Sequence, residues 1–231
     1  MYSAVRVPRK MGFDTISYVC PDTAGVFLMS GYYFCIRYIR RDIHVNEVPD
    51  MSDDLVSLSN KELRELVRAG MLVSPVQFAA QREWRKLGSA YGAETGAAAA
   101  TNCQLLDLPR GVTVWCDAEW SDGPSESQIW DYLVAWGSMV KAGGFEPGLY
   151  VGAGSKLDSD KLFGLPYFKH YWKSNSIVPE VAERGYQMYQ GFQCGYQVSG
   201  KSAGPRIHGL VIDQNLVHLD QKGDRFLVCG K

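Results

Sequence analysis

The stretch VTVWCDAEW, at 112–120, constrains the fold of this chain more than any other part of the sequence. It opens with β-branched and aromatic residues, which is typical of a buried strand, and then places two carboxylates, Asp117 and Glu119, two residues apart. Residues i and i+2 of a strand project from the same face, so both acids point to one side of a sheet. Because unpaired buried carboxylates are costly, the pair requires either cationic partners or a chemical purpose.

Length and charge limit the classes to which the chain can belong. Its 231 residues, 46% of them hydrophobic, suit a globular protein of the size of one α/β barrel, and we expect a single domain over 1–231. The formal net charge of -1 offers no basic surface, so neither nucleic acid nor membrane is an expected partner. The N-terminal segment has no apolar core of a secretory signal, which predicts synthesis in the cytoplasm without a signal peptide.

Cysteine and histidine positions give no metal pattern. The six cysteines include no Cys-x-x-Cys pair, and the four histidines show no ligand spacing. We therefore expect mostly buried free thiols and neither a metal nor a cofactor.

Strand and helix patterns alternate along the first two thirds of the chain. We expect strands at 12–18, 32–39, 71–78, 112–120 and 148–152, and helices near 22–31, 59–70, 93–106, 125–143 and 155–163. The last third predicts three more strands, at 167–172, 186–190 and 207–214, joined by links too short for much helix. The charged segment 40–58 is longer than a simple connection needs, which is typical of a loop that covers a site or moves. Eight strands with parallel crossovers predict a TIM-type α/β barrel.

In such a barrel the functional site is built at the carboxyl ends of the strands. These ends supply Asp14, Arg37, Gln77, Asp117, Glu119, Tyr150, Trp172, Tyr189, Gln190 and Asp213. Four of these residues are carboxylic acids from three separate strands, which predicts a common acidic site.

Paired carboxyl groups are the catalytic groups used in glycoside hydrolysis. One acid protonates the leaving oxygen, and a second stabilises or attacks the cationic sugar centre. We expect Glu119 to be the proton donor, Asp117 and Asp213 to hold negative charge beside it, and Asp14 to position substrate or water. Neighbouring ionised acids also raise the pKa of one member, which keeps it protonated near neutral pH.

The remaining strand-end residues are expected to contact substrate. Aromatic rings such as Tyr150, Trp172 and Tyr189 suit the apolar faces of sugars, and Arg37, Gln77 and Gln190 would bind polar groups. Structural alternatives stay open, because an acid pair in a strand is more often an ion-pair site and a lone buried aromatic residue more often belongs to the core. In that alternative, Arg37 would neutralise one of the acids.

Several motifs in fixed order resemble the glycoside-hydrolase-like family known as domain of unknown function 1906. That family is itself similar to the family 25 glycoside hydrolases, the muramidases of phage endolysins and bacterial autolysins. The resemblance covers about residues 11–216 and rests on GFDT (12–15), FCIRY (34–38), SNKELRELVRAGMLVSPV (59–76), VWCDAEW (114–120), GLYVG (148–152) and VIDQN (211–215).

The resemblance implies a barrel of five β/α units plus three further strands. Matched motif by motif, Asp14 resembles the first-strand acid, Asp117 and Glu119 the acid pair, and Asp213 the last-strand acid. FCIRY is similar to the glycoside-hydrolase-like branch rather than to the established muramidases, and the loop at 40–58 is longer than in either.

The expected activity is therefore hydrolysis of peptidoglycan glycan strands, between N-acetylmuramic acid and N-acetylglucosamine. Action at the bacterial cell wall, as a phage or prophage lysin, fits this expectation. One alternative is a non-catalytic carbohydrate-binding or virion-structural module on the same barrel. A second alternative is an amidase or deacetylase, which ranks lower because those enzymes usually use a metal or a nucleophile.

Overall fold

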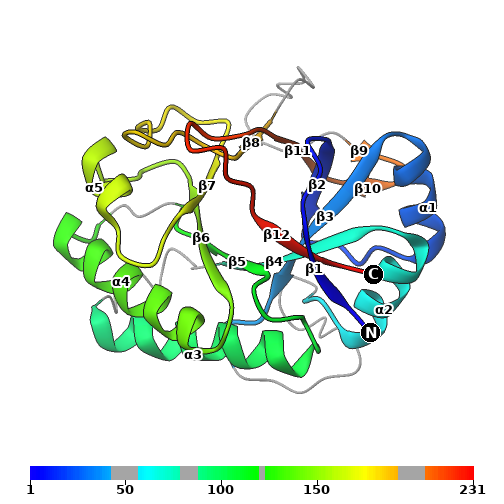
Figure 1. Cartoon of the computed structure of the whole chain (residues 1–231), viewed down its shortest axis with the longest axis horizontal. Coiled ribbons are helices and arrows are strands. Elements are labelled where there is room, and N and C mark those ends of the chain that lie inside the picture. Colours follow the sequence, from blue (N-terminus) through cyan, green and yellow to red (C-terminus); the bar gives the residue numbers. More distant parts are fainter. Residues whose placement is uncertain (43–56, 79–87, 120–122, 192–205) are drawn as a thin grey trace.

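Eight strands close into a barrel in this structure, a computed structural model that describes residues 1–42, 57–78, 88–119, 123–191 and 206–231 (Figure 1). In the order in which neighbours pair around the ring, they are β2 (Met11–Thr15), β3 (Tyr32–Ile39), β4 (Leu72–Phe78), β5 (Thr113–Asp117), β6 (Glu146–Val151), β7 (His170–Lys173), β8 (Met188–Gln190) and β11 (Asp213–Val217).

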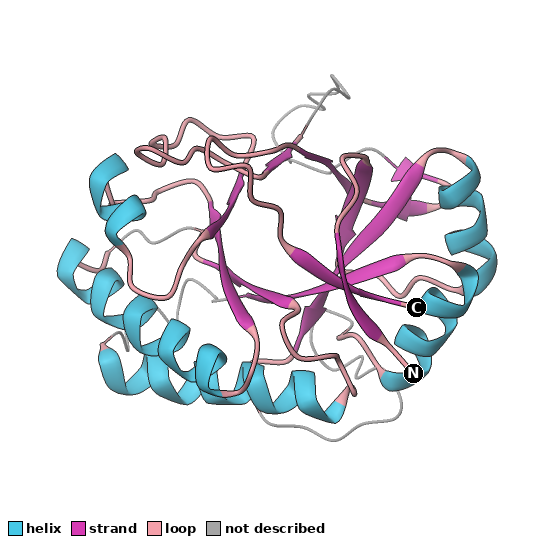
Figure 2. Cartoon of the chain, viewed as in Figure 1, coloured by secondary structure: helices cyan, strands magenta, loops and turns pink. Residues whose placement is uncertain are grey.

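In the described part of the chain, five helices lie outside the ring of strands (Figure 2). They are α1 (Pro21–Met29), α2 (Asn60–Ala69), α3 (Ser89–Leu105), α4 (Glu126–Ala142) and α5 (Ser159–Gly164). Each of these helices follows one of the strands β2 to β6, while β7, β8 and β11 have no such partner helix in the described part of the chain. The expected α/β barrel of five β/α units plus three strands is therefore confirmed.

The last barrel strand differs from the prediction in position and direction. Residues 206–211 form a separate hairpin of β9 (Arg206–Ile207) and β10 (Leu210–Val211), because His208 and Gly209 both take positive φ and make a tight turn. The barrel strand β11 then starts at Asp213 and runs antiparallel to both β8 and β2, whereas the strands from β2 to β8 pair in parallel. Because of this reversal, the first residue of β11 lies at the same barrel end as the last residues of the others.

Two strands near the chain termini were not predicted. β12 (Leu227–Gly230) pairs antiparallel with the start of β4 through Cys229 and Val73, and β1 (Ser3–Arg6) pairs with β12. Their short apolar runs lie at the barrel end opposite the carboxyl ends of the parallel strands, and the two chain termini lie beside α2 (Figure 1).

Strand alternation divides the hydrophobic core into two parts. The outward-facing residues of the strands belong to a cluster shared with the helices and loops, and the inward-facing residues fill the barrel. The barrel interior consists of Val7, Phe34, Ile36, Val76, Trp115, Tyr150, Trp172, Met188, Val217, Phe226 and Val228. On β3, Phe34 and Ile36 point inward while Cys35 and Ile39 belong to the outer core, so residues of even number face the interior from Phe34 onward, beyond the register shift that follows Tyr32.

Local signals explain the ends of the helices. Ser59 caps α2 and Gly70 ends it in the left-handed conformation, while Ser125 and Gln128 form the complete capping box of α4. α1 starts at Pro21 after Cys20 and not at an Asp cap, because proline is preset for the first helical turn. None of the helices in the described residues is long and apolar enough to cross a membrane. The predicted loop at 40–58 lies mostly outside the described residues.

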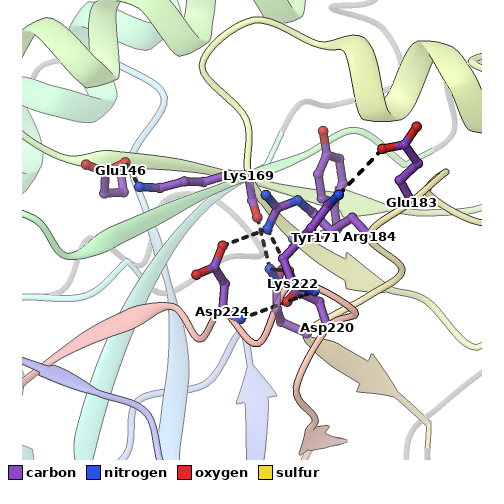
Figure 3. Close-up of polar contacts among 9 residues, drawn as sticks. Glu146, Lys169, Tyr171, Glu183, Arg184, Asp220, Lys222 and Asp224 are labelled. Atoms are coloured by element: carbon purple, nitrogen blue, oxygen red, sulfur yellow. Dashed lines mark hydrogen bonds and ion pairs between the residues drawn. The ribbon is translucent and has the colours of Figure 1, made fainter.

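The buried carboxylate of Asp220 stabilises the end of the barrel at which β8 begins and β11 ends. Asp220 accepts hydrogen bonds from Arg184 Nη1 (2.6 Å), Gln187 Nε2 (2.5 Å) and the backbone N–H groups of Lys222 and Asp224. Arg184 also pairs with Asp224 at 2.9 Å, so the guanidinium joins two acids of the same turn (Figure 3). These bonds fix the turn that leads the chain from β11 into β12.

Candidate functional site

Four carboxylates, Asp14, Asp117, Glu119 and Asp213, meet at the other end of the barrel, and we call them the acid cluster. Asp14 on β2 is the direct register partner of Asp213 on β11. Asp117 is the last residue of β5, and Glu119 follows two residues later. Electrostatic repulsion from Asp14 reaches Asp117, and that from Glu119 reaches Asp14. The structure thus brings together the four acids that were predicted from their positions at the strand ends.

Asp14 is held by amides instead of cations. Asn215 Nδ2 donates to Asp14 Oδ2 at 2.7 Å, and Gln190 Nε2 donates to the same oxygen at 3.1 Å and to Asp213 Oδ2 at 3.3 Å. Gln190 is oriented in turn by the Tyr150 hydroxyl, which donates to its Oε1 at 2.5 Å. Burial, and then repulsion from Asp213, raise the pKa of Asp14 to about 8, against the lowering effect of these amide donors.

Asp117 fixes the backbone on which Glu119 is mounted. Its Oδ1 accepts the backbone N–H of Glu119 at 3.1 Å, and burial followed by repulsion from Glu119 raises the pKa of Asp117 well above its usual value. Gly152, just beyond β6, lies against Glu119, because a Cβ at position 152 would come within 2.6 Å of Glu119 Cβ. Glu119 is half-buried and Asp213 exposed, while Asp14 and Asp117 are buried. A ligand can therefore reach Glu119 and Asp213 most directly.

Two residues of the site were missed by the sequence reasoning, Tyr38 and Asn215. Tyr38 packs against the barrel interior, and after burial the charges of all four members of the acid cluster raise the pKa of its hydroxyl well above the usual value. Asn215 lies two residues after Asp213 on the same strand face. Strand alternation identifies Tyr38 once the structure shows that Ile36 points inward, and it places Asn215 on the same face as Asp213.

Two predicted substrate contacts, Arg37 and Gln77, face the helices and not the acid cluster. Arg37 is fully buried, pairs with Glu62 of α2 at 2.7 Å and donates to the Thr15 carbonyl at 2.7 Å. Gln77 is buried too, and it accepts from Trp136 Nε1 of α4 at 2.8 Å. Both side chains stand on the outward face of their strand, so their expected role is wrong for steric reasons.

The three predicted aromatic contacts also divide between the outward face of the strands and the barrel interior. Tyr189 packs outward, edge-on to Tyr186 and His218, and is not part of the site. Trp172 is 1% exposed and packs against Tyr150 with ring centroids 4.4 Å apart, so it forms the floor below the acid cluster. Tyr150 stands between that floor and Gln190.

Within the described residues, no group of three or more His, Cys, Asp or Glu side chains has an arrangement that could hold a metal ion. Five of the cysteines are free thiols, Cys20, Cys35, Cys103, Cys116 and Cys229, and all but Cys20 are buried. Cys194 lies outside the described residues.

A family model described as "Rv2525c-like, glycoside hydrolase-like domain" matches residues 26–217. This match confirms the resemblance to a glycoside-hydrolase-like family that the motifs indicated. No curated protein sequence matches the chain.

Solved structures with the same fold include a secreted protein, a glycosyl hydrolase and an autolysin. The Tat-secreted protein Rv2525c of Mycobacterium tuberculosis superposes with a TM-score of 0.63 at 15% identity, over 91% of this chain and 96% of that one. GHIP, a glycosyl hydrolase 25 of Streptococcus pneumoniae, gives 0.56 at 13% identity, over 90% and 87%. The modular autolysin LytC of Streptococcus pneumoniae, solved with a synthetic peptidoglycan ligand, gives 0.57 at 10% identity, over 90% and 46%. At these identities the likeness shows a shared fold.

Proposed function

We propose that the chain, which belongs to the Rv2525c-like family of glycoside hydrolase-like domains, hydrolyses the glycan strands of peptidoglycan at the bacterial cell wall. One observation carries the proposal. The four carboxylates of the acid cluster converge at one barrel end, where amides hold the buried Asp14. A structural role would pair the buried Asp14 with a cation, as Arg37 pairs with Glu62 elsewhere in this chain, whereas its recorded partners are the amides of Asn215 and Gln190. The peptidoglycan ligand of LytC supports the choice of substrate.

Glu119 is our candidate for the general acid. It is the half-buried carboxyl group on the chain segment leaving β5, so the oxygen of a bulky leaving sugar can approach it. Asp117 holds its backbone and lies in the same negative field. In the proposed reaction Glu119 gives its proton to the oxygen between N-acetylmuramic acid and N-acetylglucosamine, and the negative charges of Asp117 and Asp213 stabilise the oxocarbenium-like centre. Asp14 positions substrate or water through its network with Asn215 and Gln190.

The test is an assay on purified bacterial cell walls. We expect the protein to lower the turbidity of wall suspensions and to release new reducing ends, and Glu119→Gln to lower the rate by about 100-fold or more, as for loss of a general acid. Asp131→Asn is the matched control, because Asp131 is an exposed acid on α4. Circular dichroism checks that both variants fold.

Two results would contradict the proposal. Equal rates in the parent and in Glu119→Gln would remove Glu119 from the chemistry. A parent that binds glycan strands but releases no reducing ends from any wall type would favour the non-catalytic binding module.

A further inference from the structure

Tyr38 packs against the barrel interior near the end of β3, at the barrel end that carries the acid cluster. It is the second last residue of β3, its ring stands edge-on to Phe78 with centroids 6.5 Å apart, and the residue is half-buried. The charges of Asp14, Asp117, Glu119 and Asp213 all act on its hydroxyl.

The hydrogen-bond donors around the acid cluster are almost all in use. The Gln190 amide donates to Asp14 and Asp213, and the Asn215 amide donates to Asp14. The Tyr150 hydroxyl donates to Gln190. Within the described part of the chain, the hydroxyl of Tyr38 has no hydrogen-bond partner.

One other unused donor is near, but it lies too deep for a ligand. Trp172 Nε1 has no partner among the described residues, yet Trp172 is 1% exposed and packs against Trp115 and Tyr150 inside the barrel. Among the described residues around the acid cluster, and apart from the carboxyl groups themselves, Tyr38 is therefore the half-buried donor that remains without a partner.

A sugar in this site needs both acceptors and donors. Ionised carboxylates only accept hydrogen bonds, so they bind the hydroxyl and amide protons of a sugar. The oxygen acceptors of the same sugar, hydroxyl or acetamido carbonyl, require a protein donor. Burial, and then the charges of the four acids, raise the pKa of the Tyr38 phenol well above its usual value, so that it stays protonated and remains a donor.

We propose that Tyr38 is a substrate-binding residue, whose hydroxyl donates a hydrogen bond to an uncharged oxygen of the sugar bound at the acid cluster. This inference rests on the proposed function for its choice of a peptidoglycan glycan as ligand. It requires only that the site binds the glycan, and not that the site cuts it.

The experiment compares Tyr38→Phe with Tyr150→Phe. Both substitutions remove one phenolic hydroxyl, but Tyr38 has no partner to lose whereas Tyr150 loses its hydrogen bond to Gln190. We expect Tyr38→Phe to leave the melting temperature unchanged or slightly higher, and Tyr150→Phe to lower it. Binding is measured by calorimetry in the Glu119→Gln background, with peptide-free oligomers of N-acetylmuramic acid and N-acetylglucosamine as the probe.

We expect Tyr38→Phe to weaken this binding by about three- to tenfold, the range of a single neutral hydrogen bond. On the catalytically competent chain, the same substitution should raise KM or lower kcat/KM by a similar factor. Affinity and turnover within twofold of the parent would overturn the proposal, as would a parent that does not bind the probe. A parent that binds but does not hydrolyse, with weaker binding in Tyr38→Phe, would sink the proposed activity and sustain the role of Tyr38.

Discussion

Replacing Asp14 by Asn should stabilise this protein while impairing its activity. Asp14 is 4% exposed, and it faces Asp213 with amide donors as its partners. Burial and the neighbouring charge raise its pKa from 3.8 to about 8. The folded state therefore holds a proton that the unfolded state has already released. Stability contributed by this proton is complete below about pH 4 and is lost as the pH rises towards 8.

The size of the effect follows from the pKa shift. A difference of about four pKa units, at about 1.4 kcal/mol for each, sets an upper limit near 6 kcal/mol for the cost of an ionised Asp14 above pH 8. Water around the exposed Asp213 screens part of the repulsion, so we expect a gain of about 3 kcal/mol in Asp14→Asn. For a chain of this length, such a gain raises the melting temperature by about 6–12 °C.

The assay is thermal unfolding of the parent and of Asp14→Asn at several pH values between about 4 and 9. The difference in melting temperature should be largest at the alkaline end and should shrink towards zero at the acid end, and Asp131→Asn should show no such trend. A variant that is less stable than the parent at alkaline pH would refute the reasoning, because it would mean that the Asp14 charge stabilises the fold. Wall-lysis activity should fall in the same variant.

Two further substitutions test how the site is held. Gly152→Ala should cut wall-lysis activity at least tenfold by displacing Glu119, with which the new Cβ would collide, while Gly25→Ala in α1, where the Cβ meets nothing within 4 Å, should leave lysis unchanged and stabilise the helix by about 0.5–1 kcal/mol in chemical unfolding. Arg37→Leu should lower the free energy of unfolding in urea by about 3–5 kcal/mol, because Glu62 would be left as an unpaired buried charge. The double variant with Glu62→Leu should recover much of that loss, and a double variant as unstable as the single one would argue against this cause.

The rim positions of the site could be predicted from the sequence, but the direction of the side chains could not. Arg37 and Tyr38 are neighbours at the end of one strand, and the sequence reasoning selected Arg37 as the substrate contact. In the structure Tyr38 faces the acid cluster, and Arg37 joins β3 to α2. Both faces of a barrel strand are buried, so the run YYFCIRYI shows no polar alternation from which the inward face could be read.

The position of the last acid was predicted correctly, although the direction of its strand was not. Asp213 was placed at the end of a parallel strand, whereas it begins an antiparallel one. Its predicted location was still right, because the first residue of an antiparallel strand lies at the same barrel end as the last residues of its parallel neighbours.

The close packing of α3 on α4 was also not foreseen. Gly96 of α3 lies directly against α4, since a Cβ there would come within 2.6 Å of the Trp136 carbonyl oxygen.

β12, which closes the barrel end opposite the acid cluster, limits how the protein can be shortened to a functional fragment. The span shared with the family, 26–217, stops before β12 and begins after β2. A fragment trimmed to that span would lose Asp14, and it would open the ring between β3 and β11. It would also lose Phe226 and Val228 from the interior. Such a piece would present two unpaired strand edges and should aggregate, so homology limits are a poor guide for expressing this barrel.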